Sequence, residues 1–192
     1  MNPKIILAAG HLAAGKTAFS LRLSRELGVP CFNKDCLKSA LSERLPVRNR
    51  EESKRLSAAT FDALAHIAQR LMEAGQPLIL ESNFVSGEYD WKANEAAVLR
   101  GLIERYRYRS LTFLLVGDPR ALYERFIARD NTPERGEANR LMEPLFYGDF
   151  ARSVALLGDF DIGGERVTID TTDFGRVDFD RHIETARAFL LR

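Results

Sequence analysis

The sequence predicts an α/β fold in which helices cover both faces of a parallel sheet. Short apolar runs recur along the chain, with long helical patterns between them. These runs are continuous instead of alternating between apolar and polar residues, which suits strands that are buried on both faces. The alternation of strand and helix suits parallel strands that are joined by right-handed crossovers.

Five apolar runs give the predicted strands, and the remaining patterns give the helices. Four runs are clear and the one at 29–32 is weaker, so that the strands are expected at 4–9, 29–32, 77–82, 111–116 and 166–170. The 3.6-residue period predicts helices at 51–74 and 178–190. Asp118 and Asp178 are expected to begin helices as N-caps, and Gly28 is expected to end one.

Length and composition fit a single domain over residues 1–192. The 192 residues include 45% apolar residues, enough for a core, and the net charge of +1 gives no argument for a nucleic-acid coat or a membrane surface. Cys31 and Cys36 make no disulfide framework, and both are expected to be packing residues. Residues 3–9 lack a signal-peptide pattern, and no run approaches the ~18 apolar residues of a membrane span. We therefore expect a cytoplasmic protein with no membrane partner.

A glycine-rich turn lies between the first predicted strand and the helix that follows. It matches the Gly-x-x-x-x-Gly-Lys-Thr pattern of a phosphate-binding loop, through Gly10, His11, Leu12, Ala13, Ala14, Gly15, Lys16 and Thr17. The glycines allow backbone angles that side chains forbid, so that successive N–H groups, to Ala18 in the helix, can turn toward an anion. Lys16 is expected to reach the outer phosphates of a nucleotide, and Thr17 to offer its hydroxyl to magnesium. His11 is expected only to shape the loop.

Other residues must separate the kinases, GTPases and motor ATPases that share this loop. A GTPase needs Asn-Lys-x-Asp near a late strand, whereas residues 33–36 carry Cys36 in place of the aspartate and come too early. A motor ATPase normally brings more chain for subunit contacts. Asp35 follows the second predicted strand, at the edge where parallel strands gather around a ligand. There a carboxylate can orient a hydroxyl and take its proton, and the alternative is a helix N-cap.

Residues 6–41, "ILAAGHLAAGKTAFSLRLSRELGVPCFNKDCLKSAL", resemble the front half of small P-loop kinases of the polynucleotide kinase and zeta-toxin type. That group includes chloramphenicol phosphotransferase, with gluconate and shikimate kinases as more distant relatives. The likeness continues more thinly over 77–84 and 116–136. It implies a five-stranded parallel sheet of order 2-3-1-4-5 with a helical lid, and it places a catalytic aspartate at Asp35 and a downstream basic residue at Lys38.

The resemblance also implies roles for residues that follow the later strands. Glu81 stands where relatives often carry an aspartate that supports the metal-bound water or the loop threonine; its extra carbon permits direct or water-mediated contact. Asn83 would line the same crevice, with a simple turn as the alternative. In similar kinases the loop after the last strand packs near adenine, which implies contacts from Thr172 and Asp173.

Residues 129–149 are charged, turn-rich and only partly helical, and we expect them to form a lid inserted in the domain. A plain surface loop is the alternative. Arg125 and Arg129 share one helix face, and Arg135 lies in the segment. In the kinases that the chain resembles, lid arginines close over the transferring phosphoryl group, which implies this role for Arg129 and Arg135. For Arg125 we expect a solvated surface position.

Residues 36–60 are expected to border the acceptor pocket. Their cations would favour an anionic acceptor, with a solvated helix face as the preferred alternative: Lys38, Arg44, Arg48 and Arg50. Tyr89 and Trp91 either floor a pocket for a planar or sugar-like acceptor or belong to the core.

Together these features predict an ATP- and magnesium-dependent kinase that transfers the γ-phosphoryl group to a hydroxyl of a small molecule. We expect catalysis by Lys16, Asp35, Arg129 and Arg135, acceptor binding by Asp35, Lys38 and Asn83, and metal binding by Thr17 and Glu81. One alternative is a kinase of 5′-hydroxyl nucleic-acid ends, which the low net charge disfavours. Another is a nucleotide-dependent binding or regulatory module. We expect a monomer or a homodimer.

Overall fold

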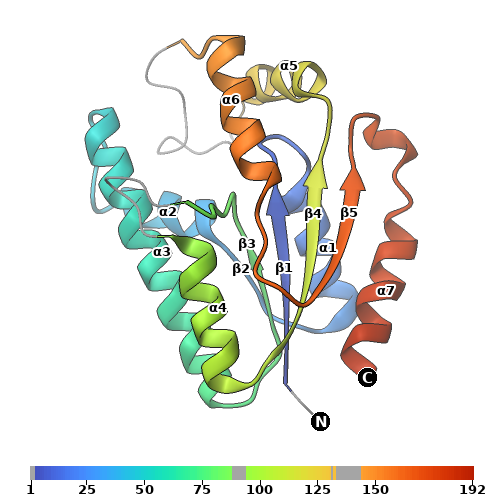
Figure 1. Cartoon of the computed structure of the whole chain (residues 1–192). Helices are drawn as coiled ribbons and strands as arrows, with labels where there is room; N and C mark the ends of the chain where they lie inside the picture. The colour runs from blue at the N-terminus through green and yellow to red at the C-terminus, as the bar shows by residue number, and fades with distance from the viewer. Residues whose placement is uncertain (1–2, 88–93, 131, 133–143) are drawn as a thin grey trace.

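The computed structural model describes residues 3–87, 94–130, 132 and 144–192. Its centre is one five-stranded parallel sheet in the order β2-β3-β1-β4-β5 (Figure 1). The strands are β1 (Lys4–Gly10), β2 (Cys31–Asn33), β3 (Leu78–Glu81), β4 (Arg109–Val116) and β5 (Glu165–Asp170). The predicted fold class, strand positions and strand order are therefore confirmed.

Helices connect the strands and cover the sheet. They are α1 (Lys16–Leu27), α2 (Lys34–Ser42), α3 (Arg50–Glu73), α4 (Glu95–Tyr106), α5 (Pro119–Asp130), α6 (Tyr147–Gly158) and α7 (Phe179–Leu191), with a short 3₁₀ turn, η3 (Phe174–Arg176). The predicted helices at 51–74 and 178–190 correspond to α3 and α7. Neither α4 nor α6 was predicted individually.

The helix ends follow the sequence signals in all but one case. Asp118 accepts hydrogen bonds from two backbone N–H groups of the first turn of α5, and Asp178 accepts one from the first turn of α7. Gly28, with φ 66°, ends α1. For α2, however, the N-cap is Asn33, whose Oδ1 accepts a hydrogen bond of 2.8 Å from the N–H of Cys36. The N-cap alternative for Asp35 is therefore wrong, because helical geometry begins earlier and Asp35 lies in the first turn.

Apolar side chains cover both faces of the sheet, and Figure 1 shows α3 and α4 on one face and α1 and α7 on the other. Successive residues of β1 alternate between the two layers: Leu7 packs in the layer under α3 and α4, and Ile6 packs in the layer under α1 and α7. From Ile5 to Ala9 the strand is apolar at each position because both faces are buried. Each fully buried large apolar side chain stabilises the fold by about 1.5–3 kcal/mol, and the largest include Phe19, Phe61, Phe84, Phe113, Phe150, Phe160 and Phe189.

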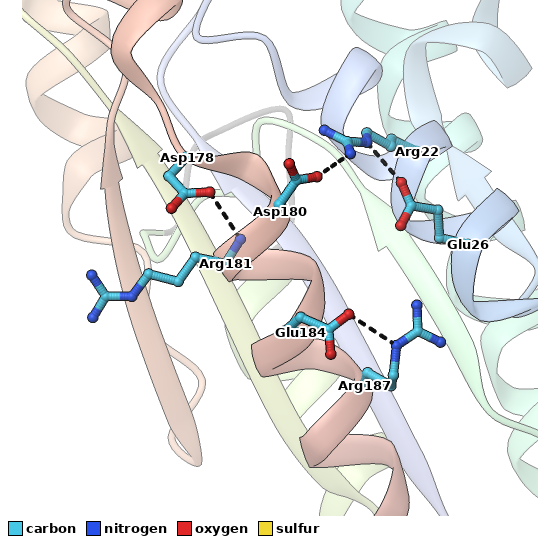
Figure 2. Close-up of polar contacts among 7 residues, drawn as sticks. All are labelled: Arg22, Glu26, Asp178, Asp180, Arg181, Glu184 and Arg187. Carbon is cyan, nitrogen blue, oxygen red and sulfur yellow. Dashed lines mark hydrogen bonds and ion pairs between the residues drawn. The ribbon is translucent and has the colours of Figure 1, made fainter.

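Charged residues join α1 to α7 on the outer surface (Figure 2). Arg22 of α1 pairs with Glu26 one turn later, at 2.8 Å, and with Asp180 of α7. Farther along α7, Arg187 pairs with Glu184 at 3.2 Å. We call these five residues the α1–α7 charge cluster. Their side chains are between 38% and 79% exposed, so water screens the pairs strongly.

The strand register brings the carboxyl ends of the strands to one edge of the sheet. Ala8 of β1 is paired with Glu81 of β3, which is paired in turn with Asn33 of β2. On the other side, Gly10 is paired with Leu115 of β4. Side chains that follow these strands are thus held near the turn that leads from β1 to α1. No helix in the described part of the chain is both long and apolar enough to cross a membrane.

Candidate active site

Two glycines give the turn from β1 to α1 its shape. Gly10 has φ 112°, and a Cβ there would lie 2.2 Å from the carbonyl oxygen of Leu115. Gly15 has φ 82° as the N-cap of α1, and a Cβ there would lie 2.2 Å from the ring of Phe174. The N–H of His11 donates to the Leu115 carbonyl at 2.8 Å, which fixes the turn on β4. Any side chain at either glycine would need both a rare backbone angle and a shift of its neighbours.

The turn forms one wall of a cavity whose other walls come from distant parts of the sequence. The lining residues are Leu12, Ala13, Ala14, Gly15, Lys16, Thr17, Asp35, Glu81, Asn83 and Arg129. They come from the loop and α1, from α2, from β3 and the residues after it, and from α5. Four side chains that the sequence singled out separately are therefore brought together with the loop: Asp35, Glu81, Asn83 and Arg129.

Lys16 is a buried cation that lines this cavity. Its ammonium group donates to the carbonyl oxygens of His11, at 2.6 Å, and Gly10, at 3.2 Å, and the residue is 6% exposed. Burial lowers the pKa of Lys16 below its usual range, while the carboxylates of Glu81 and Asp35 oppose that shift. A buried ammonium of this kind gains strongly from an anion that replaces lost water.

Glu81 holds the loop threonine directly. Its Oε2 accepts a hydrogen bond of 3.1 Å from the hydroxyl of Thr17, and the residue is 4% exposed. Burial raises the pKa of Glu81, and Asp35 raises it further, while Lys16 and the Thr17 hydrogen bond lower it. The extra carbon of glutamate thus reaches the loop with no intervening group.

Asn33 makes a contact that the sequence did not indicate. Its Nδ2 donates to the Thr17 hydroxyl at 3.3 Å, while its Oδ1 caps α2. One side chain therefore ties the phosphate-binding loop to the turn that carries Asp35. One feature of the sequence could have indicated this contact. Asn33 is a residue type that caps helices, and it ends a strand at the edge of the sheet where ligands bind.

The oxygen atoms near the loop suit a magnesium ion that arrives with phosphates. Thr17 and Glu81 supply a hydroxyl and a carboxylate, which are hard oxygen ligands. Among the described residues, no three His, Cys, Asp or Glu side chains form a group that could hold a metal ion. Magnesium usually binds through one or two protein groups together with substrate phosphates, and these residues fit that arrangement.

Two residues that line the cavity each carry a buried polar atom that has no hydrogen-bond partner among the described residues. These atoms are the Nε of Arg129 and the Oδ1 of Asn83. Buried polar atoms in folded proteins are nearly always paired, so each indicates a group that completes the site. A cationic donor at Arg129 suits an anion, and an amide oxygen at Asn83 suits a hydroxyl or a water. The Arg129 donor, together with Lys16 on the same cavity, is our evidence that a phosphate-bearing ligand fits the residues present.

His11 belongs to the loop, but it is not among the residues that line the cavity. Its Nδ1 accepts a hydrogen bond of 3.3 Å from the N–H of Gly117, and it is 9% exposed. Burial lowers the pKa of His11, which favours the neutral ring. These contacts agree with the structural role expected for this residue.

Arg125 corrects one expectation. Instead of extending into solvent, its guanidinium donates to the carbonyl oxygens of Thr171, at 2.7 Å, and Thr172. It therefore fastens α5 to the loop that follows β5, because the helix face it shares with Arg129 is turned toward that loop. Sequence spacing shows which residues share a face but not what lies opposite.

The loop after β5 lies beside the phosphate-binding loop through the contact of Phe174 with Gly15. Thr172 uses its hydroxyl to accept from the N–H of Asp118, at 2.8 Å, and to donate to Asp170, at 2.6 Å. Asp173 accepts from the N–H of Gly175 at 3.2 Å. These local bonds shape the loop, and contacts of Thr172 and Asp173 with a nucleotide stay predictions.

The remaining predicted residues lie farther from the cavity or outside the described residues. Lys38 is 7% exposed and donates to the hydroxyl of Ser53 at 2.9 Å, between α2 and α3. The cations Arg44, Arg48 and Arg50 are exposed, as the alternative of a solvated surface predicts. Ala18 is exposed in the first turn of α1. Most of the expected lid, with Arg135, and the residues Tyr89 and Trp91 lie outside the described residues.

Comparisons with known proteins agree with this fold. A family model described as "AAA domain" matches residues 5–144. None of the curated protein sequences compared with the chain matches it. Among solved structures, one described as a "putative kinase" from Chloroflexus aurantiacus j-10-fl is similar with a TM-score of 0.86 and 25% identity, over 98% of each chain.

Two further structures share the fold at lower identity. The APS kinase CysC of Mycobacterium tuberculosis, solved with AMPPNP and APS, has a TM-score of 0.59 and 14% identity, over 100% of this chain and 99% of that chain. A gluconokinase from Sinorhizobium meliloti 1021 has a TM-score of 0.56 and 16% identity, over 99% of this chain and 93% of that chain. The resemblance to small P-loop kinases is thus confirmed.

Proposed function

This chain belongs to the AAA domain family, and we propose that it is an ATP- and magnesium-dependent kinase that phosphorylates a hydroxyl of a small molecule. The observation that carries the proposal is the meeting, around one cavity, of the phosphate-binding loop, Asp35 and Arg129. The APS kinase that shares the fold was solved with the ATP analogue AMPPNP, which supports ATP as the phosphoryl donor.

The loop and Lys16 are proposed to hold the phosphates of ATP. Residues 12–17, which include the loop and the amino end of α1, line the cavity, and such an end of a helix favours anions. Lys16 lies among them as a buried cation. Magnesium, held near Thr17 and Glu81, would neutralise charge on the two outer phosphates.

Asp35 is proposed as the base. It accepts a hydrogen bond from the acceptor hydroxyl and orients the oxygen toward the γ-phosphorus. A new bond forms between that oxygen and the phosphorus, the bond from phosphorus to the β-phosphate oxygen breaks, and the hydroxyl proton passes to the Asp35 carboxylate. The products are the phosphorylated acceptor and ADP.

Arg129 is proposed to bind the phosphoryl group during transfer. Its guanidinium presents a planar fork of donors, its side chain lines the cavity, and its buried Nε has no hydrogen-bond partner among the described residues. Arg135 is proposed to join it from the lid. An arginine in this role can contribute ~10³-fold or more to the rate.

The acceptor is proposed to lie on the α2 side of the cavity, in contact with Asp35 and Asn83 and near Lys38. Gluconokinase and shikimate kinase, which share the fold, are named for small hydroxyl-bearing acceptors, which supports a small molecule. The net charge of +1 gives no general attraction for a nucleic acid.

A screen of acceptors tests the proposal. The protein is incubated with MgATP and a broad metabolite mixture, together with sugars, nucleosides, aminoglycoside-type alcohols and 5′-hydroxyl oligonucleotides, and mass spectrometry records any gain of one phosphate. We expect a small hydroxyl-bearing compound to be phosphorylated by the native protein and not by Asp35→Asn. Transfer only to oligonucleotide ends would replace the small-molecule proposal, and ATP binding with no transfer to any acceptor would favour a regulatory module.

A further inference from the structure

We infer that the buried ion pair between Lys34 and Glu95 is a positioning device that sets Asp35 against the phosphoryl donor; this inference rests on the proposed function. The Nζ of Lys34 lies 3.3 Å from the Oε1 of Glu95, and the two side chains are 5% and 0% exposed. Lys34 is the first residue of α2, directly before Asp35, and Glu95 is the first residue of α4. Neither lines the phosphate cavity, so neither is placed to touch the reacting atoms.

Glu95 connects this pair to the residues that follow β3. Its second oxygen accepts a hydrogen bond of 3.1 Å from the N–H of Val85, and the N–H of Ala96 donates to the Val85 carbonyl at 3.1 Å. Asn94 adds a bond from its Nδ2 to the carbonyl of Ser86 at 2.9 Å. The start of α4 thus holds the chain two residues beyond Asn83, which lies in the cavity.

The turn that carries Asp35 is therefore fixed on two sides. On one side Asn33 joins it to the phosphate-binding loop through Thr17. On the other side Lys34 joins it to α4 through Glu95. The two residues before Asp35 make both connections, which leaves the Asp35 side chain little freedom to shift relative to Lys16 or Asn83.

The burial of the pair argues for position above stability. Two charges removed from water lose solvation that their mutual attraction only partly replaces, and apolar residues of similar volume often stabilise a fold at least as well. Glu95 gains some compensation from the Val85 N–H and from the amino end of α4. What the pair adds beyond an apolar contact is a defined distance and direction between α2 and α4. A misplacement of ~1 Å at a reacting group can cost ~10²-fold in rate, so this precision bears on transfer.

The test removes both charges together, because a single substitution would leave one buried charge without the opposite charge that now faces it. Lys34→Met keeps the aliphatic stem, and Glu95→Gln keeps an oxygen for the Val85 N–H. The control is the matched double variant Arg187→Met/Glu184→Gln, which removes an exposed pair on α7. Four quantities are measured for each protein: kcat with the acceptor found in the screen, the Kd for ATP, the melting temperature, and hydrogen exchange of the backbone amides at 34–38 and 84–86.

We expect kcat of Lys34→Met/Glu95→Gln to fall ~10- to 100-fold, in line with a displacement of up to ~1 Å. The Kd for ATP and the melting temperature should stay near their native values, and exchange at 34–38 and 84–86 should become faster. The single variant Lys34→Arg, which keeps the positive charge opposite Glu95, should have a kcat between those of the double variant and the native protein. The control variant should match the native protein in all four quantities.

Two outcomes would overturn the inference. One is a native kcat and native exchange in Lys34→Met/Glu95→Gln. The other is a parallel loss of kcat, ATP affinity and melting temperature, which would mean that the pair only stabilises the fold. If the native protein transfers phosphate to no acceptor, the proposed function fails separately, while the exchange measurement still decides whether the pair fixes the Asp35 turn.

Discussion

Charged side chains from distant elements come together in two regions of the molecule. The α1–α7 charge cluster is exposed to solvent, whereas charges beside the phosphate-binding loop are buried. In the α1–α7 cluster the side chains are between 38% and 79% exposed (Figure 2), and water already solvates both signs. In the cavity, Lys16 and Glu81 are 6% and 4% exposed. Exposed charges such as those of the α1–α7 cluster pair and separate at little cost in free energy, whereas burying charges such as Lys16 and Glu81 costs considerable free energy.

The difference separates charges that serve solubility from charges that serve a ligand. Burial lowers the pKa of Lys16 and raises the pKa of Glu81, so each group would be more easily neutralised than in water. A fold that only needed stability would have little reason to bury them. Substitutions in the cavity are therefore expected to change activity far more than folding, and substitutions in the α1–α7 cluster are expected to change neither.

The largest effect is expected at Asp35. Asp35→Asn keeps the size of the side chain and removes its capacity to take a proton, so transfer should fall ~10²–10⁴-fold while ATP binding stays nearly native. Steady-state kinetics and calorimetry measure the two quantities. Asp62→Asn, on the exposed face of α3, is the matched control and should have native activity. Native transfer by Asp35→Asn would remove Asp35 from the mechanism.

The second largest effect on transfer is expected at Arg129. Arg129→Gln removes a half-buried cation that lines the cavity, and kcat should fall ~10²–10³-fold, as when one stabilising donor is removed from a transition state. Arg120→Gln removes an exposed arginine from the same helix and serves as the control. An equal kcat for the two variants would contradict the proposed role of Arg129.

The two cysteines, one in β2 and one in α2, allow burial to be compared at two neighbouring positions close to Asp35. Burial raises the pKa of Cys31 to about 11, while Cys36 is exposed. Because the thiolate is the reactive form, Cys31 should be labelled at least ~10-fold more slowly than Cys36 at pH 8, and its rate should keep rising up to pH 10. Mass spectrometry of iodoacetamide-treated protein gives both rates. Faster labelling of Cys31 would mean that this side of the sheet is open to solvent.

The smallest effect is expected in the α1–α7 charge cluster. Arg22→Met removes contacts to Glu26 and Asp180, and exposed pairs of this kind often contribute nothing measurable. We expect the urea midpoint of unfolding and the transfer rate to match the native protein. A loss as large as that of a core truncation such as Phe19→Ala would show that exposure alone does not separate the two regions.

Local patterns in the sequence were sufficient for the strands and the loop. Gly10 and Gly15 adopt the positive φ angles that the loop pattern requires. Asp35, Glu81 and Asn83 meet because the ends of parallel strands share one edge, and that rule can be applied with no coordinates.

Contacts between elements could not be predicted in this way. The pair of Lys34 with Glu95 joins residues 61 positions apart, and neither has a local signature. The bonds of Arg125 to the loop after β5 depend on how α5 is rotated, which residue spacing leaves open. The bond of Asn33 to Thr17 could not be predicted either, because it depends on the register of β2 beside β3.

Calorimetry with ATP and magnesium tests the central claim most directly, namely that the loop and Lys16 grip a triphosphate. The native protein should release or absorb heat in a saturable, one-to-one titration with MgATP. Lys16→Met, which keeps the apolar stem and loses the charge, should bind far more weakly while its melting temperature stays close to native. The absence of a binding signal for any purine triphosphate in the native protein, or equal affinity in Lys16→Met, would contradict the account.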